Sequence, residues 1–581
     1  MNIKFSGWGN ISIADALYSN YLWKRYFMND TTVSGYRWLY LFIFLAALVN
    51  FSGLFTTIIG PDGTMYATIA KTMILRHDYV NMYVLNRDWL DKPHFPFWVT
   101  ALFFNVFGIH TWGYKLPGIL FMMMGAAYTY LFAKRLYNKE IALWSVLILL
   151  TAEHIVLSNG DVRAEPYLTG LIIASVYHFY RSYNPTKYGH MLAGCVFAAC
   201  SIMTKGMFAI VPIGGAIAGH LIIRREWNQL FRWQWFAAIV LTILLIVPEL
   251  YCLYEQFDLH PEKVVFDQTH VSGIRWFFWD SQFGRFFNTG PIKGTGDPSF
   301  FIHTTLWAFL PWSLLLFAAI FRFIRKGTRN INAFEWYCIS GAMLTFILFS
   351  LSQFQLPYYL NIVYPFFAII TARYLYNIQS PGSIKAAGII QRSLLAVLLL
   401  AIAILHYFFR PEMFNWFTGV LLAMLLVALF FLPQKISKTF LWRLGLSSVL
   451  VSLVINVYLN LAFYPSLLKY QALSEAAFWI NDHNADKLPV AQVSDVPPFA
   501  LEFYLDQPMN NISPDGTGPL PVKPFYLLTT DVVLNNLKAK GWQAEPVKTF
   551  RGFWISRLKP GFLNKATRNK ELTYSQLVIV Q

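Results

Sequence analysis

Charged residues are scarce in this chain of 581 residues: they make up 13% of it, against about 25% in soluble domains. Hydrophobic residues make up 56%. Apolar runs of about twenty residues recur between positions 38 and 464, and each is long enough to cross about 30 Å of hydrocarbon. The scarcity of charge therefore excludes an ordinary soluble protein and predicts a polytopic membrane protein.

Cysteine is also scarce, and its pattern excludes a disulfide scaffold, a zinc site and a thiol catalyst. The four cysteines lie in or beside apolar runs: Cys195, Cys200, Cys252 and Cys338. The first residues lack the apolar core that signal peptidase recognises, so 1–37 is expected to be a cytoplasmic or interfacial segment. The net charge of +16 comes from basic residues in short loops between apolar runs. Such residues set membrane topology, and we expect no nucleic acid partner.

About thirteen membrane spans are predicted from the apolar runs. They are placed near 38–59, 116–133, 140–157, 166–182, 188–203, 206–223, 233–253, 299–321, 332–351, 356–376, 390–409, 413–432 and 441–464. Alternate loops are basic, which places those loops and the N-terminus in the cytoplasm. The cytoplasmic set includes Lys134, Arg224, Arg325 and Lys438. The short apolar piece 95–110 is expected to form an interfacial or re-entrant helix.

The expected fold is a helical membrane part with a small C-terminal α/β domain outside the membrane. The membrane part covers 38–464, with external loops at 60–115 and 254–298. An odd number of spans places 465–581 on the external (periplasmic) face of the inner membrane, and Pro, Asp, Asn and Gly return there. In this C-terminal region, helices are predicted near 471–484 and 531–541, and strands near 488–493, 525–530, 546–557 and 573–580.

Ionisable groups gather on the predicted external face. They are costly at membrane depth, so their convergence on one face indicates a site there. The set comprises Asp62, Tyr66, Asp91, Lys92, His94, Asp161, Arg163, Glu165, Lys205, Arg275, Arg285, Lys293 and His303. Carboxylates can take a proton from a hydroxyl, and Lys and Arg can hold a phosphate as it leaves. A lipid phosphate carrying an activated group suits both kinds of charge, because its tail can lie between helices.

Six motifs in this order resemble those of the GT-C glycosyltransferases over nearly the whole chain. They are Asp62-Gly63-Thr64-Met65-Tyr66-Ala67, Trp89-Leu90-Asp91-Lys92-Pro93, Arg163-Ala164-Glu165-Pro166-Tyr167-Leu168, Met203-Thr204-Lys205-Gly206, Arg285-Phe286 and Gln355-Leu356-Pro357-Tyr358-Tyr359-Leu360. The chain is most similar to the lipid A aminoarabinose transferase group, which is itself similar to the protein O-mannosyltransferases.

The resemblance implies an inverting transfer of a sugar from a polyprenyl (undecaprenyl) phosphate to a lipid, glycan or protein acceptor on the external face. By motif position, Asp62 matches the first-loop acid, and Lys92 and Arg285 match the donor-phosphate binders. Trp89 and Tyr359 match aromatic positions near that phosphate. We expect Asp62 to be the proton acceptor and to be kept ionised by positive charge in the loop that Lys92 closes.

The second acid of the site stays open between two residues. The motif selects Glu165, whereas Asp161 lies four residues earlier and would share its face if the helix extended that far. Tyr66, Asp91 and Lys205 are further site candidates.

Several positions depart from the family pattern, and they leave the sugar and the acceptor open. An acid and a base usual after the first Asp are replaced by Gly63 and Met65. These departures argue against the aminoarabinose enzyme itself. Asp91, His94 and His270 are candidate ligands for a divalent metal, and no other cofactor is indicated. The alternative function is a transporter or flippase of a lipid-linked sugar that performs no chemistry.

Overall fold

The computed structural model describes residues 33–183, 188–326, 335–437, 439–493, 498–512 and 520–581. The predicted N-terminal segment 1–37 lies almost wholly outside them. The chain is a multi-pass membrane protein: six described helical stretches are long and apolar enough to cross a bilayer, and a bent pair makes a seventh. The six are α5 (Thr111–Leu136), η1 with α10 (Met207–Arg224), α11 to η2 (Trp227–Asp258), α20 (Pro381–Phe409), α21 (Trp416–Ile436) and α22 to α23 (Phe440–Leu468).

Every predicted span overlaps a helix or a helix pair, but many of these helices do not meet the length and hydropathy criterion for a span. The count of about thirteen therefore stays a prediction. The helices that do not meet the criterion are α2 (Val33–Phe51), α8 (Ala164–Arg181), α9 (Tyr188–Lys205), α16 (Phe300–Ala308), α17 (Ser313–Lys326), α18 (Glu335–Leu351) and α19 (Tyr364–Asn377). The 3-10 turn η5 (Pro357–Val363) precedes α19. Helices α6 (Lys139–Leu150) and α7 (Glu153–Gly160) meet it only together, as the bent pair.

Several helices break inside the protein, where the chain carries its polar residues. Helices α6 and α7 bend by 53° at their junction, and α7 ends at Gly160 before α8 begins at Ala164. Helix α9 ends at Lys205 because Gly206 has a φ of +102°, which other residues rarely adopt. A Cβ on Gly206 would also lie 2.5 Å from the amide of Gln282. Unwound backbone at membrane depth is tolerated where other parts of the protein cover it.

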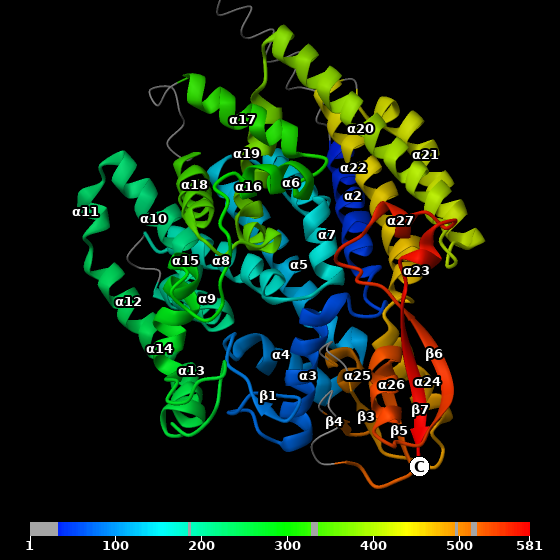
Figure 1. Ribbon diagram of the computed structural model, residues 1–581. Helices are drawn as coiled ribbons and strands as arrows, with labels where there is room; N and C mark the ends of the chain where they lie inside the picture. The colour runs from blue at the N-terminus through cyan, green and yellow to red at the C-terminus, as the bar shows by residue number, and fades with distance from the viewer. Residues whose placement is uncertain (1–32, 184–187, 327–334, 438, 494–497, 513–519) are drawn as a thin grey trace, which may run out of the picture.

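The segment 60–115 is more regular than the external loop expected there. It contains α3 (Gly60–Arg76), a hairpin of β1 (Tyr83–Val84) and β2 (Arg87–Asp88), and α4 (Phe95–Phe107). Pro61 stands in the first turn of α3, where its missing N–H costs no hydrogen bond. Helix α4 packs on α3, and the two lie side by side at the lower end of Figure 1. The later segment 254–298 holds α14 (Gly273–Arg275), the π-helix η3 (Trp276–Gly284) and α15 (Arg285–Phe287).

The C-terminal region (465–581) contains a five-stranded sheet of order β4-β3-β5-β7-β6. Strand β3 runs parallel to β4 and β5, while β7 pairs antiparallel with β5 and β6. Each helix and strand predicted here overlaps an element of the structure, whereas β4, α25 and α27 were not predicted. The elements are α24 (Ala472–His483), β3 (Val490–Gln492), α25 (Phe499–Tyr504), β4 (Met509–Asn511), β5 (Phe525–Thr530), α26 (Asp531–Ala539), β6 (Ala544–Gly552), α27 (Pro560–Leu563) and β7 (Thr573–Val580).

Helix α25 lies against α3, so the C-terminal region and the segment 60–115 occupy the same end of the molecule (Figure 1). The end of α17 and the start of α20 lie at the opposite end.

Candidate active site

The first acid, Asp62, lies in the first turn of helix α3. Gly60 begins the helix with a φ of +71°, and the Thr64 hydroxyl donates to the carbonyl oxygens of Gly60 and Pro61 at 3.2 and 2.9 Å. A carboxylate at this position faces the positive end of the helix dipole. The Asp62 side chain is 49% exposed, so the carboxylate is accessible to a bound molecule.

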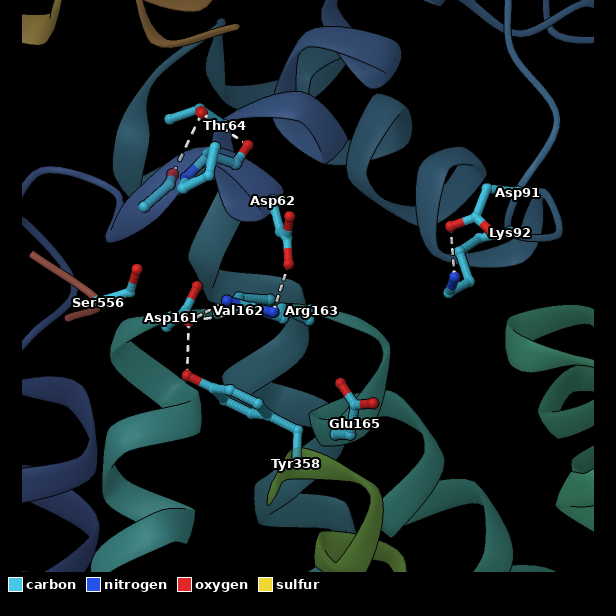
Figure 2. Close-up of polar contacts among 12 residues, drawn as sticks. Asp62, Thr64, Asp91, Lys92, Asp161, Val162, Arg163, Glu165, Tyr358 and Ser556 are labelled. Atoms are coloured by element: carbon cyan, nitrogen blue, oxygen red, sulfur yellow. Dashed lines mark hydrogen bonds and ion pairs between the residues drawn. The ribbon is translucent and has the colours of Figure 1, made fainter. Parts of the chain in front are cut away.

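Arg163 joins Asp62 to a second carboxylate. Its Nη1 lies 2.5 Å from Asp62 Oδ2, and its Nη2 and Nε lie 2.9 and 3.2 Å from Asp161 Oδ2 (Figure 2). Tyr358 donates its hydroxyl to the same Asp161 oxygen at 2.7 Å, and its ring lies 4.4 Å from the Arg163 guanidinium carbon. Burial alone would lower the pKa of Arg163, but the two carboxylates and Tyr358 raise it well above the ordinary value. Arg163 therefore carries a permanent charge at the centre of this group.

Glu165 belongs to a separate ion pair. It stands in the first turn of α8, and its Oε1 accepts from Lys205 Nζ at 2.5 Å. The Lys205 ammonium also lies 3.7 Å from the centre of the Tyr359 ring. The condition under which Asp161 would share a helix face with Glu165 is not met, because α8 begins only at Ala164 and Asp161 is the C-cap residue of α7.

A third charged group joins the two predicted phosphate binders through Asp91. Lys92 Nζ donates to Asp91 Oδ2 at 2.5 Å, and the Arg285 guanidinium donates to Asp91 Oδ1. Burial alone would raise the pKa of Asp91, but the charges of Lys92 and Arg285 outweigh it and lower that pKa. Burial lowers the pKa of Lys92 to about 8, against the opposing effect of Asp91. The positive charge that contacts Asp62 is therefore that of Arg163, whereas Lys92 pairs with Asp91.

Two adjoining cavities lie beside these ion pairs. The first, of about 50 Å³, is lined by Lys92, Lys205, Arg285 and Tyr359 among others. The second, of about 280 Å³, has a wholly apolar lining that comprises Phe208, Val211, Phe283, Phe286, Phe287, Leu348 and Phe349. Phe208 and Phe349 line both cavities, so a pocket with three basic groups adjoins an apolar pocket.

Trp89 and Tyr66 lie apart from the basic pocket, in an aromatic cluster with Phe97. The ring centroids are 6.2 Å apart for Tyr66 and Trp89 and 5.6 Å apart for Trp89 and Phe97. Trp89 is not among the residues that line the basic cavity, whereas Tyr359 is. Burial raises the pKa of the Tyr66 phenol well above its ordinary value, and the nearby carboxylates add to the effect. The cluster packs α3 against α4.

The three metal candidates do not form a site. His94 is buried, with Nδ1 3.0 Å from Glu249 Oε1 and Nε2 2.9 Å from the Val80 carbonyl oxygen, so both ring nitrogens are engaged. Asp91 is bound by its two basic partners, and the His270 ring contacts Thr269 at an exposed position. Among the described residues, no group of three or more His, Cys, Asp and Glu side chains has the geometry of a metal site.

Sequence reasoning missed the central role of Arg163 and the part played by Tyr358. Both residues stood within the matched motifs, but nothing in their spacing showed that they converge on Asp161. The one available signal was the run Asp161-x-Arg163-x-Glu165, a charged triplet at the boundary between two apolar runs.

Comparison with known proteins gives matches to glycosyltransferases. The dolichyl-phosphate-mannose-protein mannosyltransferase family matches residues 91–252. An uncharacterised protein from Aquifex aeolicus is 26% identical over 60% of this chain and 65% of its own length. The undecaprenyl phosphate-alpha-4-amino-4-deoxy-L-arabinose arabinosyl transferase of Edwardsiella ictaluri is 25% identical over 57% of this chain and 58% of its own length. These matches thus span less than two thirds of each relative.

A solved structure shares the fold over almost the whole chain. ArnT from Cupriavidus metallidurans, in its crystal structure bound to undecaprenyl phosphate, superposes with a TM-score of 0.71 at 18% identity. The superposition covers 94% of this chain and 98% of that one. The chain therefore has the GT-C fold, and the resemblance predicted from the six motifs is confirmed.

Proposed function

We propose that this chain, with its GT-C fold, is an integral-membrane inverting glycosyltransferase that takes its sugar from a polyprenyl phosphate. The basic cavity and the apolar cavity that adjoins it carry the proposal. Lys92, Lys205 and Arg285 would bind the phosphate through charge-assisted hydrogen bonds. The neighbouring phenylalanines would bind the start of the polyprenyl chain. The related fold of a protein crystallised with undecaprenyl phosphate supports this ligand class.

The charged groups divide the reaction between them. The acceptor oxygen attacks the anomeric carbon from the face opposite the phosphate, and the bond from that carbon to the phosphate oxygen breaks. Lys92, Lys205 and Arg285 stabilise the negative charge that builds on the leaving phosphate. If the acceptor is a hydroxyl, Asp62 takes its proton. An acceptor that is itself a phosphate is already anionic and needs no base.

Asp161 is the second acid of this site in our proposal. It shares the Arg163 guanidinium with Asp62, so the two carboxylates are held in one arrangement. Glu165 is bound to Lys205 and lies on the donor side, where it orients that ammonium under Tyr359. Asp161 thus positions the base, Asp62, through Arg163. Glu165 positions the Lys205 ammonium that would bind the phosphate.

We further propose that the protein lies in the inner (plasma) membrane with its N-terminus in the cytoplasm. Residues 38–464 would form the membrane domain with about thirteen spans, and 465–581 an external α/β domain. The arrangement of the ends supports this orientation: Asp62 and the C-terminal region lie at one end, opposite the end of α17 (Figure 1). Helix α17 ends in a basic stretch that includes Arg322 and Arg325.

The proposal is tested with purified protein in detergent and a polyprenyl-phosphate-linked sugar. A transferase forms glycosylated acceptor and releases free polyprenyl phosphate, whereas a flippase leaves the donor intact. Mass spectrometry of envelope lipids, glycans and glycoproteins, with and without the gene, would identify the acceptor and the sugar.

A further inference from the structure

Two residues shortly before Asp62 in the chain, Ile58 and Gly60, are bound by the C-terminal region. Gln471 Nε2 donates to the Ile58 carbonyl oxygen at 3.0 Å, and Gln471 Oε1 accepts from the Gly60 amide at 3.1 Å. The Tyr504 hydroxyl accepts from the Ile58 amide at 2.8 Å. These contacts join residues more than 400 positions apart, just where the chain enters helix α3.

Gln471 has a particular place in the chain. It follows α23, the last turn of the final apolar stretch, and caps α24, the first helix of the C-terminal region. Its carboxamide offers a donor and an acceptor, like a backbone peptide group. It therefore pairs with the Ile58 carbonyl and the Gly60 amide as the backbone of a neighbouring strand would. The junction between the membrane part and the C-terminal region is thereby fixed to the entrance of α3.

A second set of contacts holds the body of α3. Lys71 Nζ donates to the carbonyl oxygens of Glu502, Phe503 and Leu505 at 2.6–2.9 Å, and so caps the end of α25. The Thr68 hydroxyl donates to the Phe499 carbonyl oxygen at 3.2 Å. Helix α25 therefore lies along α3, as Figure 1 shows, and fixes its direction as well as its first turn.

We propose that Gln471 and Tyr504 are positioning residues for sugar transfer, through which the C-terminal region sets the location of the Asp62 carboxylate. The proposal rests on the proposed function, since Asp62 matters for transfer only if it serves as the base. Asp62 is the second residue after the bound Gly60, so a shift at the entrance of α3 moves the carboxylate. The donor pocket is built from other elements, and both side-chain hydrogen bonds that Gln471 makes in the described part of the chain go to residues outside the pocket lining, Ile58 and Gly60.

The test is Gln471→Leu, which keeps the approximate size of the side chain and removes both hydrogen bonds. We expect kcat to fall about 10- to 100-fold, since a small misplacement of a catalytic group has effects of this order. The KM for the donor should stay within about twofold. Gln471→Glu, which keeps the acceptor for Gly60 and loses the donor to Ile58, should lie between wild type and Gln471→Leu. Tyr504→Phe should lower kcat less, because its ring keeps its packing on Phe478.

Gln507→Leu is the matched control. Gln507 lies in the same region, and its amide donates to the Leu488 carbonyl oxygen at 2.7 Å without touching α3. This variant should keep wild-type turnover. Hydrogen exchange at the Gly60 amide should rise in Gln471→Leu and stay unchanged in Gln507→Leu. This measurement reports the hydrogen bond between Gly60 and Gln471 independently of turnover.

A double-mutant cycle separates positioning from general destabilisation. If Gln471 acts through Asp62, then Gln471→Leu should change the residual turnover of Asp62→Asn by less than about twofold. A full, independent loss in that background would overturn the inference, as would wild-type turnover of Gln471→Leu. Absence of transfer by every variant and by wild type would instead remove the proposed function itself.

Discussion

The Arg163 guanidinium lies 2.5 Å from the Asp62 carboxylate, although 101 residues separate the two in sequence. The same guanidinium contacts Asp161 and lies over the Tyr358 ring. Arg163, which lies between α7 and α8, therefore holds the Asp62 carboxylate at the start of α3 in place. Any movement of either segment changes the distance between the base and its partners.

Arg163→Lys is expected to lower kcat about 10- to 100-fold, which corresponds to loss of one charge-assisted hydrogen bond. A single ammonium cannot hold two carboxylates in the way that a planar guanidinium does. The KM for the donor should change little. Arg275→Lys is the control, because that side chain is 73% exposed and pairs only loosely with Asp280. Equal turnover in the two variants would show that the bridge between Asp62 and Asp161 is not needed.

Lys92→Ala and Arg285→Ala are each expected to lower kcat/KM for the donor about 10- to 100-fold, because each removes a charged contact to phosphate. Arg285→Lys should recover only part of the loss, since the forked geometry is missing. Lys293→Ala tests an exposed lysine of the same segment, 254–298, and should behave as wild type. Binding of a labelled polyprenyl phosphate measures the effect directly, and unchanged binding would remove the substituted residue from the site.

The pH dependence of donor use should follow Lys92, because burial lowers its pKa to about 8. The charged form binds phosphate, so kcat/KM for the donor should fall as pH rises through about 8. Arg keeps its charge throughout this range. Lys92→Arg should therefore remove the alkaline limb, and its persistence in that variant would assign the limb to another group.

Membrane orientation is testable by labelling single cysteines from outside intact cells, in a background that lacks the four native cysteines. Cys at position 535, for exposed Asn535 in α26, should react with an impermeant reagent. Cys at position 325, for exposed Arg325 in α17, should react only after the membrane is opened. The reverse pattern would invert the proposed topology.

Sequence predicted the elements of this fold better than their contacts. Apolar runs marked the helices because hydrophobicity along a span is a local property, and alternation marked the longer strands of the C-terminal region. Strand β4 has three residues, too few for a pattern to show. Motif position singled out Asp62, Lys92 and Arg285, and the structure places the latter two around one cavity.

The pairing of the charges could not be predicted. The positive charge beside Asp62 was expected in the loop that Lys92 closes, yet Arg163 supplies it from the break between α7 and α8, and Lys92 pairs with Asp91. Helix α8 starts at Ala164, one residue before Glu165, so Asp161 belongs to the end of α7 and not to the helix of Glu165. The spacing of His94 likewise gave no sign of Glu249, which lies 155 positions away and occupies one of its ring nitrogens.

The central claim is that this protein transfers a sugar from a polyprenyl phosphate with Asp62 as the base. It is tested most directly by the turnover of purified wild-type protein and Asp62→Asn, measured as release of free polyprenyl phosphate with formation of glycosylated acceptor. For a hydroxyl acceptor, the account predicts release by the wild type and a fall of about 10²–10⁴ in kcat for Asp62→Asn, with donor binding retained. Near-normal turnover of Asp62→Asn beside inactive Asp161→Asn or Glu165→Gln would contradict the choice of carboxylate. An intact donor with wild-type protein would contradict the reaction itself.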